Sequence, residues 1–286
     1  MLECNETLQQ ALERNVEDAL REDIGRGDRT ARLVPPKKRV QAFVTAKEDA
    51  VVAGQSWFAA CVARLDTDAQ IQWLVHEGAP VKANSAVCRI SDDARALLSA
   101  ERSALNFLQM LSGVATVTRR YVDEISGVSP NSKGCAILDT RKTLPGLRQA
   151  QKYAVRVGGG LNHRMALWDG ILIKENHIVA AGGVRRALEQ AKSLGGNISI
   201  QIEVENLVEL QEALDAGAEC ILLDDFSLDD MSHAFIVNGG RAVLEVSGGV
   251  DLDSLRAIAA TGVDRISSGA LTKHVRAIDL SMRIHA

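Results

Sequence analysis

The chain has 286 residues, of which 46% are hydrophobic and 24% are charged. This length and apolar content allow one large domain or two modest ones, each with a buried core. The 33 basic and 37 acidic side chains give a formal net charge of −4, which excludes an overall basic field that would hold nucleic acid. Any site for an anion must therefore be local.

The cysteines and the N-terminus indicate an ordinary cytoplasmic protein. The five cysteines are widely spread and form no CxxC pair, so reduced thiols are expected rather than a zinc or redox site. The opening residues MLECNETLQQALERNV carry acids where a secretory signal would carry basic residues and an apolar run. Apolar stretches are interrupted well before the roughly 18 residues that a membrane span requires. We therefore expect no membrane and no nucleic acid among the partners.

The first third of the chain mixes helical and strand-like patterns. Apolar residues at helical spacing over 8–20 predict a helix, and a glycine-rich turn at 25–28 follows. VQAFVTAKE, IQWLV and SAVCRI are strand-like. A strong helix is predicted from about Asp92 to Leu111, with Ser91 or Asp92 as its N-terminal cap. These patterns together indicate an α+β module.

From residue 135 onward, short apolar runs alternate with helical segments, which is typical of βα units and a parallel sheet. The runs are CAILDT, GILIKE, SIQIEVE, CILLDD, AVLEVSGG and RISSGA. Their ends are roughly 20 to 35 residues apart, as expected for a strand, a helix and two loops. Helices are predicted at about 184–194 and 206–216, each followed by glycine. The spacing favours a barrel, and with six clear strands an open barrel fits as well as a closed one.

Every one of these strands ends in polar side chains or in small residues with free backbone N–H groups. In parallel α/β architectures, function gathers at such strand ends. A solvated strand end readily explains any single one of them, but much less readily all six together. The residues concerned are Asp139, Thr140, Arg141, Lys142, Lys174, Glu203, Asp224, Ser247, Gly248, Gly249, Ser268, Gly269 and Ala270.

The segment from Arg141 to Lys174 carries seven basic side chains and one acid, Asp169, in a chain that is acidic overall. This excess indicates an anion site. Arginine grips carboxylate or phosphate with a planar fork and lysine offers a point charge, so the mixture suits a ligand with both groups. The bases expected on solvated helix faces are Arg148, Lys152 and Arg156. The better candidates for the site are Arg141, Lys142, His163, Arg164 and Lys174.

Several features of this predicted site have more than one interpretation. The glycines at 158–160 allow either a close approach of backbone to ligand or a flexible turn. His163 is a base, an anion contact or a packed core histidine. Glu203 and Asp224 are acids in a basic pocket, and their partners are sugar hydroxyls or a Mg²⁺ carried by a diphosphate, or Lys174 in a structural salt bridge. The SGG and SGA strings at the last two strand ends are typical of a phosphate site.

Long collinear strings of the chain resemble the quinolinate phosphoribosyltransferase family. These strings are DTRKTLPGLR at 139–148, GGGLNHR at 158–164, ILIKENHI at 171–178 and IEVEN at 202–206. The likeness extends to ERSALNFLQMLSGVAT at 101–116, EVSGGV at 245–250 and ISSGALTKH at 266–274, so it spans nearly the whole chain. The resemblance implies that phosphoribosyl diphosphate and quinolinate give nicotinate mononucleotide, diphosphate and CO2, with Mg²⁺, in NAD biosynthesis.

The resemblance also implies a fold and a homodimer. It implies an N-terminal α/β sandwich domain over 1–114, with the tail at about 272–286 packed on it. An incomplete α/β barrel with parallel strands would occupy 115–271 and carry the active site. Arg102 would reach into the neighbouring subunit's site. Its position beside the apolar stripe of its helix would otherwise suggest a snorkelling arginine.

Position by position, the resemblance implies roles for the matched residues, and Thr140 lies in the substrate site that it implies. The residues implied to hold the quinolinate carboxylates are Arg102, Arg141, His163 and Arg164. Those implied to be catalytic are Lys142, Lys174, Glu203 and Asp224. Glu203 and Asp224 would also address the ribose hydroxyls and, through diphosphate and water, the metal. The loops at 247–249 and 268–270 would cradle the sugar phosphate. Asp225 departs from the family, which usually has Asn there.

Other classes of protein fit parts of the pattern. ILLDD at 221–225 superficially suggests another class of phosphoribosyltransferase, although the FSLDDM that follows lacks its Thr/Gly phosphate loop. Lys174 at a strand end is a possible nucleophile of a Schiff-base aldolase. A paralogue acting on another anion, or a binding protein that keeps the pocket, is a further alternative.

Overall fold

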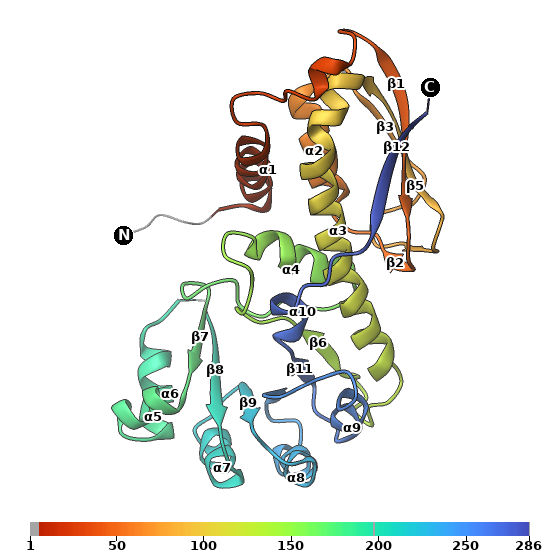
Figure 1. Cartoon of the computed structure of the whole chain (residues 1–286). Helices are drawn as coiled ribbons and strands as arrows, with labels where there is room; N and C mark the ends of the chain where they lie inside the picture. The colour runs from red at the N-terminus through yellow and green to blue at the C-terminus, as the bar shows by residue number, and fades with distance from the viewer. Residues whose placement is uncertain (1–5, 197, 286) are drawn as a thin grey trace. The chain divides into compact units, whose positions relative to one another are not determined.

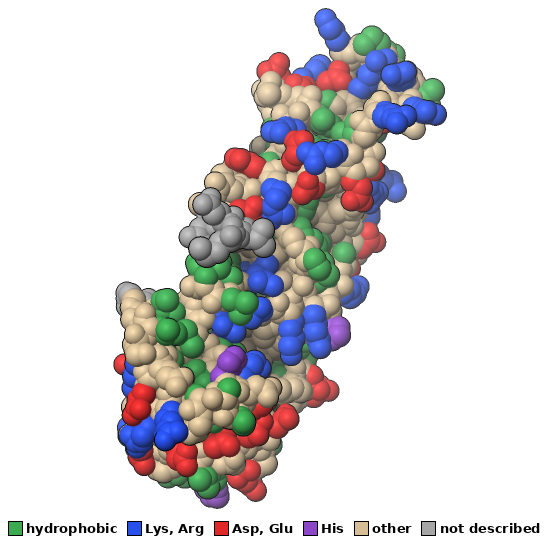
Figure 2. Space-filling view, turned by 90° about the vertical axis from the view of Figure 1, so that its left-hand side faces the viewer, with side chains coloured by type: hydrophobic (Ala, Val, Ile, Leu, Met, Phe, Trp, Pro, Cys, Tyr) green, Lys and Arg blue, Asp and Glu red, His purple; other side chains and the backbone are tan. Residues whose placement is uncertain are grey.

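A computed structural model describes residues 6–196 and 198–285, and the chain divides into two compact units (Figure 1). The first, here called the N-terminal unit, comprises Met1–Arg119, Thr143–Gly159 and His274–Ala286. The second, the barrel unit, comprises Arg120–Lys142 and Gly160–Lys273. Figure 2 shows acidic and basic side chains interspersed over the face it displays, consistent with the absence of one dominant basic field.

The N-terminal unit is built on a four-stranded antiparallel sheet, of order β12-β1-β5-β3. Its strands are β1 (Arg39–Ala46), β3 (Gln70–Trp73), β5 (Ala86–Asp93) and β12 (Leu280–His285). The three strand-like sequences of the first third therefore form strands. The unit also has a two-stranded pair, β2 (Ala50–Val51) and β4 (Pro80–Val81), a 3-10 turn (Ala31–Leu33), and the helices α1 (Leu8–Ile24) and α2 (Gln55–Leu65). Thr7 caps α1 in a capping box with Gln10.

The long helix α3 (Ala94–Ile125) extends well beyond the predicted end at Leu111. Its apolar stripe continues through buried Val114, and no glycine or proline signal strong enough to stop it occurs before Ile125. The predicted cap was also wrong, because Oδ1 of Asp93 accepts the backbone N–H groups of Arg95 and Ala96 at 2.9 and 3.2 Å. The strand β5 runs up to that cap.

Helix α4 (Arg148–Val157) corrects the prediction for its basic residues. Arg156 is exposed as expected, but Lys152 is fully buried, and Arg148 is half-buried with its Nε donating to Oγ1 of Thr143 at 3.1 Å. Four-residue spacing puts these three side chains on one face of the helix. The middle of that face, at Lys152, is buried. The tight approach at Gly158 explains its lack of a side chain, since a Cβ there would lie 2.6 Å from the carbonyl oxygen of Ala115 in α3.

The barrel unit holds one six-stranded parallel sheet of order β6-β11-β10-β9-β8-β7. The strands are β6 (Ala136–Leu138), β7 (Gly170–Ile173), β8 (Ser199–Val204), β9 (Cys220–Asp224), β10 (Val243–Ser247) and β11 (Arg265–Ser267). All six coincide with the apolar runs, so the parallel sheet is confirmed. The edge strands β6 and β7 do not pair, so the barrel is incomplete. Leu161 forms an isolated parallel bridge to Leu138, beside the free edge of β6.

Helices connect these strands, as βα units require (Figure 1). They are α5 (Glu175–Ala181), α6 (Val184–Ser193), α7 (Leu207–Asp215), α8 (Leu228–Asn238), α9 (Leu255–Ala260) and the short α10 (Ala270–Lys273). The predicted helices at 184–194 and 206–216 correspond to α6 and α7. Asn206 and Ser227 cap α7 and α8 by accepting backbone N–H groups at 3.0 and 3.1 Å. Because consecutive strands run parallel, their carboxyl ends meet at one rim of the sheet.

Two further expectations concern the whole chain. Over residues 6–196 and 198–285, no helix combines the length and the apolar character that crossing a membrane requires. Cys61, Cys88, Cys135 and Cys220 are free thiols, and burial raises the pKa of Cys61 and of Cys88 to about 12. Cys4 lies outside the described residues.

Candidate functional site

The carboxyl ends of the barrel strands bring most of the predicted residues to one rim. We call this set the strand-end rim: residues 140–142, Lys174, Glu203, Asp224, 247–249 and 268–270. The register supports the grouping, because Ser247 lies opposite Asp224 and Ser267 lies opposite Leu138, so the strands end at matching levels. Arg102 is not part of this group, since it belongs to the N-terminal unit, where it is exposed on α3.

Lys174 and two carboxylates form the charged part of the rim. Nζ of Lys174 lies 3.2 Å from Oε2 of Glu203, whose side chain is almost fully buried. Burial is the largest influence on Glu203 and raises its pKa, which Lys174 opposes and Asp224 reinforces. Burial also raises the pKa of Asp224, with the negative charge of Asp225 as the next cause. The Lys174–Glu203 salt bridge that was considered as an alternative is present.

Two glycines keep the rim loops close to these charged groups. A Cβ on Gly248 would lie 2.9 Å from Oδ1 of Asp225 and 3.3 Å from Oδ1 of Asp224. Gly248 also has φ of +94°, where side chains are strained. A Cβ on Gly269 would lie 2.9 Å from Cδ of Lys142. The glycines of SGG and SGA thus serve close packing against the charged side chains as well as turning the chain.

Asp225 adopts a left-handed backbone conformation, with φ of +53°. Asn and Asp are the residues other than glycine that tolerate this region, because their short polar side chains bond locally. The conformation gives a physical reason why a short polar residue such as Asp is tolerated at position 225.

The loops at 140–142 and 268–270 are held by their own hydrogen bonds. Oγ1 of Thr140 accepts the backbone N–H of Lys142 at 3.0 Å, and Thr272 donates its hydroxyl to the carbonyl of Lys142 at 2.8 Å. The buried Ser268 hydroxyl donates to the carbonyl of Val250 at 3.2 Å. The exposed Lys142 side chain and the loop backbone therefore remain as the groups best placed to meet a ligand.

Arg164 and Arg141 form a second charged cluster, which is positive. Burial is the main cause that lowers the pKa of the Arg164 guanidinium, and the nearby charge of Arg141 lowers it further. Nη1 of Arg164 donates to the carbonyl of Gly170 at 2.8 Å. Asp169, the one acid of this basic segment, accepts two backbone N–H groups of its own turn, at 2.7 and 2.9 Å. A half-buried cation beside a second cation indicates a place prepared for an anion.

Buried Asp139 holds the backbone that carries His163 and Arg164. Its Oδ1 accepts the N–H of His163 at 2.9 Å, and its Oδ2 accepts Nδ2 of Asn162 at 2.5 Å. The ring of His163 then points to Gln201, with 2.8 Å between Nε2 and Oε1. His163 is therefore half-buried, and its ring is held by hydrogen bonds.

Gln201 and Glu245 were missed by sequence reasoning. Nε2 of Gln201 donates to Oε2 of the fully buried Glu245 at 3.1 Å. Both residues line a cavity of about 300 Å³ together with His163, Arg164 and Arg265. A signal was available, since strand alternation puts Gln201 on the same face as Glu203, and Glu245 on the same face as Ser247.

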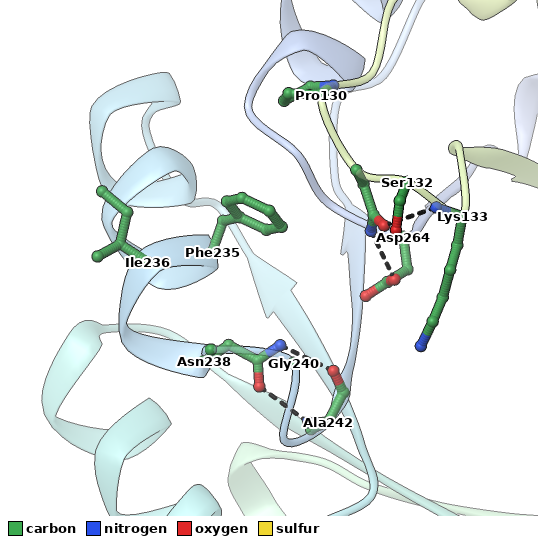
Figure 3. Close-up of a pocket in the computed structure, with 11 residues that line it drawn as sticks. Pro130, Ser132, Lys133, Phe235, Ile236, Asn238, Gly240, Ala242 and Asp264 are labelled. Atoms are coloured by element: carbon green, nitrogen blue, oxygen red, sulfur yellow. Dashed lines mark hydrogen bonds between the residues drawn. The ribbon is translucent and has the colours of Figure 1, made fainter.

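A larger pocket, of about 500 Å³, lies elsewhere in the barrel unit (Figure 3). It adjoins the amino ends of β10 and β11, and none of the residues predicted from the sequence lines it. Its polar groups are engaged with one another, for example Nδ2 of Asn131 with Oδ1 of Asp264 at 2.8 Å. The described geometry therefore favours the strand-end rim, not this pocket, as the site of chemistry.

Comparison with known proteins identifies what the chain resembles. Family models described as "Quinolinate phosphoribosyl transferase, N-terminal domain" and "C-terminal domain" match residues 28–112 and 114–283. A probable nicotinate-nucleotide pyrophosphorylase [carboxylating] of Bacillus subtilis is 39% identical, over 92% of this chain and 90% of its own length. A quinolinate phosphoribosyltransferase [decarboxylating] of Nicotiana tabacum is 37% identical, over 93% and 80%. The solved nicotinate-nucleotide pyrophosphorylase of Francisella tularensis is 46% identical, with a TM-score of 0.93 over 98% of both chains.

Proposed function

The chain belongs to the quinolinate phosphoribosyl transferase family, and we propose that the strand-end rim is where quinolinate receives the phosphoribosyl group. The activity is phosphoribosyl transfer from phosphoribosyl diphosphate to quinolinate with decarboxylation, in NAD biosynthesis. Because the chain belongs to this family, the two alternative assignments, a Schiff-base aldolase and another class of phosphoribosyltransferase, have no support. The observation that carries the proposed location is the closeness of the half-buried Arg164 guanidinium to Arg141 of the strand-end rim, whose charge adds to burial in lowering the Arg164 pKa.

Quinolinate carries two carboxylates, and the arginine pair suits them. Arg141 and Arg164 offer guanidinium forks, and each fork can donate two parallel hydrogen bonds to one carboxylate. His163 and Thr140 complete the proposed pyridine site. A dianion would relieve the repulsion between these two half-buried cations, so binding of substrate would also stabilise the arginine pair.

The phosphoribosyl part of the second substrate fits the remaining rim. Lys142 and Lys174 would meet its negative charge, while Glu203 and Asp224 would accept hydrogen bonds from the ribose hydroxyls. The loops at 247–249 and 268–270 would present backbone N–H groups to the 5′-phosphate. Lys174 would exchange part of its contact with Glu203 for phosphate oxygens when the substrate enters.

Mg²⁺ fits this donor set when it arrives with the diphosphate. Among the described residues, no three His, Cys, Asp or Glu side chains gather closely enough to hold a metal ion alone. Mg²⁺ usually keeps several waters and is bound through one or two carboxylates plus substrate phosphates. Glu203 and Asp224 provide those two carboxylates. The ion, when bound, neutralises charge on the departing diphosphate.

The proposed mechanism needs no nucleophile from the protein. The pyridine nitrogen of quinolinate attacks the anomeric carbon of the sugar as the bond to diphosphate breaks, through an oxocarbenium-like transition state. The arginine pair orients the ring, and Lys142 and Lys174 stabilise the leaving charge. The carboxylate next to the ring nitrogen then leaves as CO2, and the adjacent positive nitrogen stabilises the resulting carbanion until it takes a proton. The chain thus works by positioning and electrostatics.

We also infer a homodimer in the cytoplasm, with Arg102 entering the neighbouring subunit's site. Arg102 is exposed on α3, which leaves its guanidinium available to a partner. Two exposed apolar side chains follow Arg164 in the sequence: Leu167 is 72% exposed and Trp168 is 54% exposed. Burial of these two adjacent apolar side chains by a second subunit would stabilise the dimer.

The decisive experiment mixes the chain with quinolinate, phosphoribosyl diphosphate and Mg²⁺. Release of CO2 and formation of the mononucleotide are followed, with nicotinate as the competing substrate. We expect turnover of quinolinate and none of nicotinate, because only the dicarboxylate satisfies both arginines. Absence of quinolinate turnover in a well-folded preparation would contradict the assignment. Borohydride trapping of Lys174 with a keto substrate should give no stable adduct.

A further inference from the structure

We propose that Glu245 and Gln201 are positioning residues that fix the tautomer of the His163 ring and, through it, the backbone at Arg164. The three side chains and that backbone form one continuous chain of hydrogen bonds inside the barrel unit. The functional consequence rests on the proposed role of Arg164 in binding quinolinate. The hydrogen-bond chain itself does not depend on that role, so the two can be tested separately.

The chain of contacts starts at the fully buried carboxylate of Glu245. Its Oε2 accepts Nε2 of Gln201 at 3.1 Å, and Oε1 of Gln201 lies 2.8 Å from Nε2 of His163. Nδ1 of His163 then accepts the backbone N–H of Arg164 at 2.8 Å. Both ring nitrogens are therefore engaged at hydrogen-bond distance.

The carboxylate determines the direction of every bond in this chain. Oε2 of Glu245 accepts the hydrogen bond in the structure, and a carboxylate oxygen without a proton can only accept, so the amide group that faces it is the NH2 of Gln201. The carbonyl of Gln201 must then face His163, whose Nε2 has to carry the proton. Nδ1 is left unprotonated and can accept from the N–H of Arg164. Reversing the Gln201 amide would place two donors or two acceptors against each other at both of its ends.

A neutral group at position 245 would lose this directing effect. Glutamine there offers both a donor and an acceptor, so the amide of Gln201 could take either orientation, and His163 either tautomer. In the tautomer with a proton on Nδ1, the ring nitrogen and the N–H of Arg164 would both be donors. The hydrogen bond from the backbone N–H of Arg164 to the His163 ring would then be lost.

The cost of burying Glu245 supports a role beyond stability. Among the described residues, its Oε1 has no hydrogen-bond partner and lies 3.7 Å from Nε2 of His163. A buried carboxylate with one unsatisfied oxygen is unfavourable for folding compared with an apolar residue. A carboxylate is nevertheless the one side-chain group of this size that dictates the amide orientation. Asp139 also holds the backbone N–H of His163 and the carbonyl of Gly170 holds the Arg164 guanidinium, so the ring contact adds a third constraint, on the backbone N–H of Arg164.

The test is the near-isosteric variant Glu245→Gln, followed by nitrogen NMR of the histidine rings. Six histidines are present, so His163→Asn assigns the resonances. We expect Nε2 protonated and Nδ1 unprotonated in the wild-type chain, and a mixture of tautomers in Glu245→Gln. We also expect the KM for quinolinate to rise about tenfold, by analogy with the roughly 10–100-fold cost of removing groups that orient metal-binding histidines. The KM for phosphoribosyl diphosphate should stay unchanged.

Glu219→Gln is the matched control, because Glu219 lines the same cavity but is exposed, and no hydrogen bond of its side chain is described. It should change neither the tautomer nor either KM. Gln201→Met is a second variant that removes the link without adding a polar group, and it should release the tautomer in the same way. If neither variant folds, the wild-type spectrum still decides, since a proton on Nδ1 of His163 would overturn the proposal.

Two outcomes separate the proposal from the function on which it rests. An unchanged tautomer in folded Glu245→Gln would overturn the positioning role, whatever the kinetics. A changed tautomer with an unchanged quinolinate KM in both Glu245→Gln and Arg164→Ala would keep the hydrogen-bond chain, but would refute the role of Arg164 in binding. A parallel rise in both KM values would indicate a general structural effect and count against the proposal.

Discussion

Replacing the buried Asp92 by asparagine should stabilise the protein at alkaline pH. Asp92 is completely buried, and Oδ1 accepts the N–H of Asp93. Burial is the main cause that raises its pKa to about 7, and the neighbouring Asp66 carboxylate adds to the effect. Arg39 opposes it, but its guanidinium lies against Asp66, at 3.2 Å. Asp92 therefore holds a proton that Asp66 does not.

The sign and size follow from the difference between the folded and ordinary pKa values. A raised pKa means that folding favours the protonated form, so the free energy of unfolding falls as pH rises from about 4 to about 7. A shift from 3.8 to about 7 corresponds to at most about 4 kcal/mol. Asparagine imitates the protonated acid at every pH. Asp92→Asn should thus match the wild type near pH 4 and exceed it increasingly up to pH 7.

Thermal unfolding at pH 5 and pH 8, followed by circular dichroism, measures the effect. The increase in Tm at pH 8 should be on the order of 5–10 °C, and that at pH 5 clearly smaller. Asp68→Asn, an exposed aspartate close in sequence to Asp66, is the control and should show no such dependence on pH. An equal difference at both pH values, or a loss of stability at pH 8, would refute the reasoning.

The remaining predictions concern the site and the assembly. Gly248→Ala would place a methyl group 2.9 Å from a carboxylate oxygen and should raise the KM for phosphoribosyl diphosphate several-fold. Gly240→Ala, also at positive φ but outside the rim and with nothing within 4 Å of its Cβ, is the matched control, and equal effects would argue against the steric explanation. Gly158→Ala, whose Cβ would lie 2.6 Å from a backbone oxygen of α3, should cost about 1–3 kcal/mol in chemical denaturation, and an unchanged midpoint would contradict the packing. Inactive Arg102→Ala and Lys174→Ala chains, co-refolded in equal amounts, should regain about a quarter of wild-type activity, because half the dimers would have one intact site of two; well-folded mixed dimers without activity would show that Arg102 acts in its own subunit. Removing Mg²⁺ with a chelator should abolish turnover, and full activity in its absence would exclude the proposed neutralisation of diphosphate.

Patterns of short range predicted the barrel well. Each strand of the parallel sheet is a buried apolar run that ends in a polar group, and both properties are local in the sequence. The ends of those runs therefore identified the rim, including Lys174 and Asp224. The N-terminal cap of α3 was misplaced by one residue, because Ser91, Asp92 and Asp93 are all good caps and only the backbone geometry selects Asp93.

Features that depend on packing between distant segments were beyond the same patterns. Lys152 has the spacing of a solvated helical face, but the face is buried by tertiary structure. Glu245 and Gln201 are close only because their strands share a sheet with β9 between them. Arg102 sits in a helix whose own pattern gives no functional signal, so its proposed role came from resemblance alone. The pair of Gln201 and Glu245 joins side chains that are 44 residues apart in the chain.

The segment that carries His163 and Arg164 lies beside the open edge of the barrel, outside the six-stranded sheet. Beside the free edge of β6, one bridge at Leu161 replaces a full strand, and Asp139 holds the following backbone with a side chain instead of a sheet ladder. A segment attached in this way can exchange residues without disturbing strand register. Replacing His163 and Arg164 to accept a different ring acid would therefore leave the sheet intact, provided that Asp139, Gln201 and Glu245 were changed to suit. The proposed substrate contacts of His163 and Arg164 therefore lie in a segment outside the sheet, where residues can change without altering the pairing of the strands.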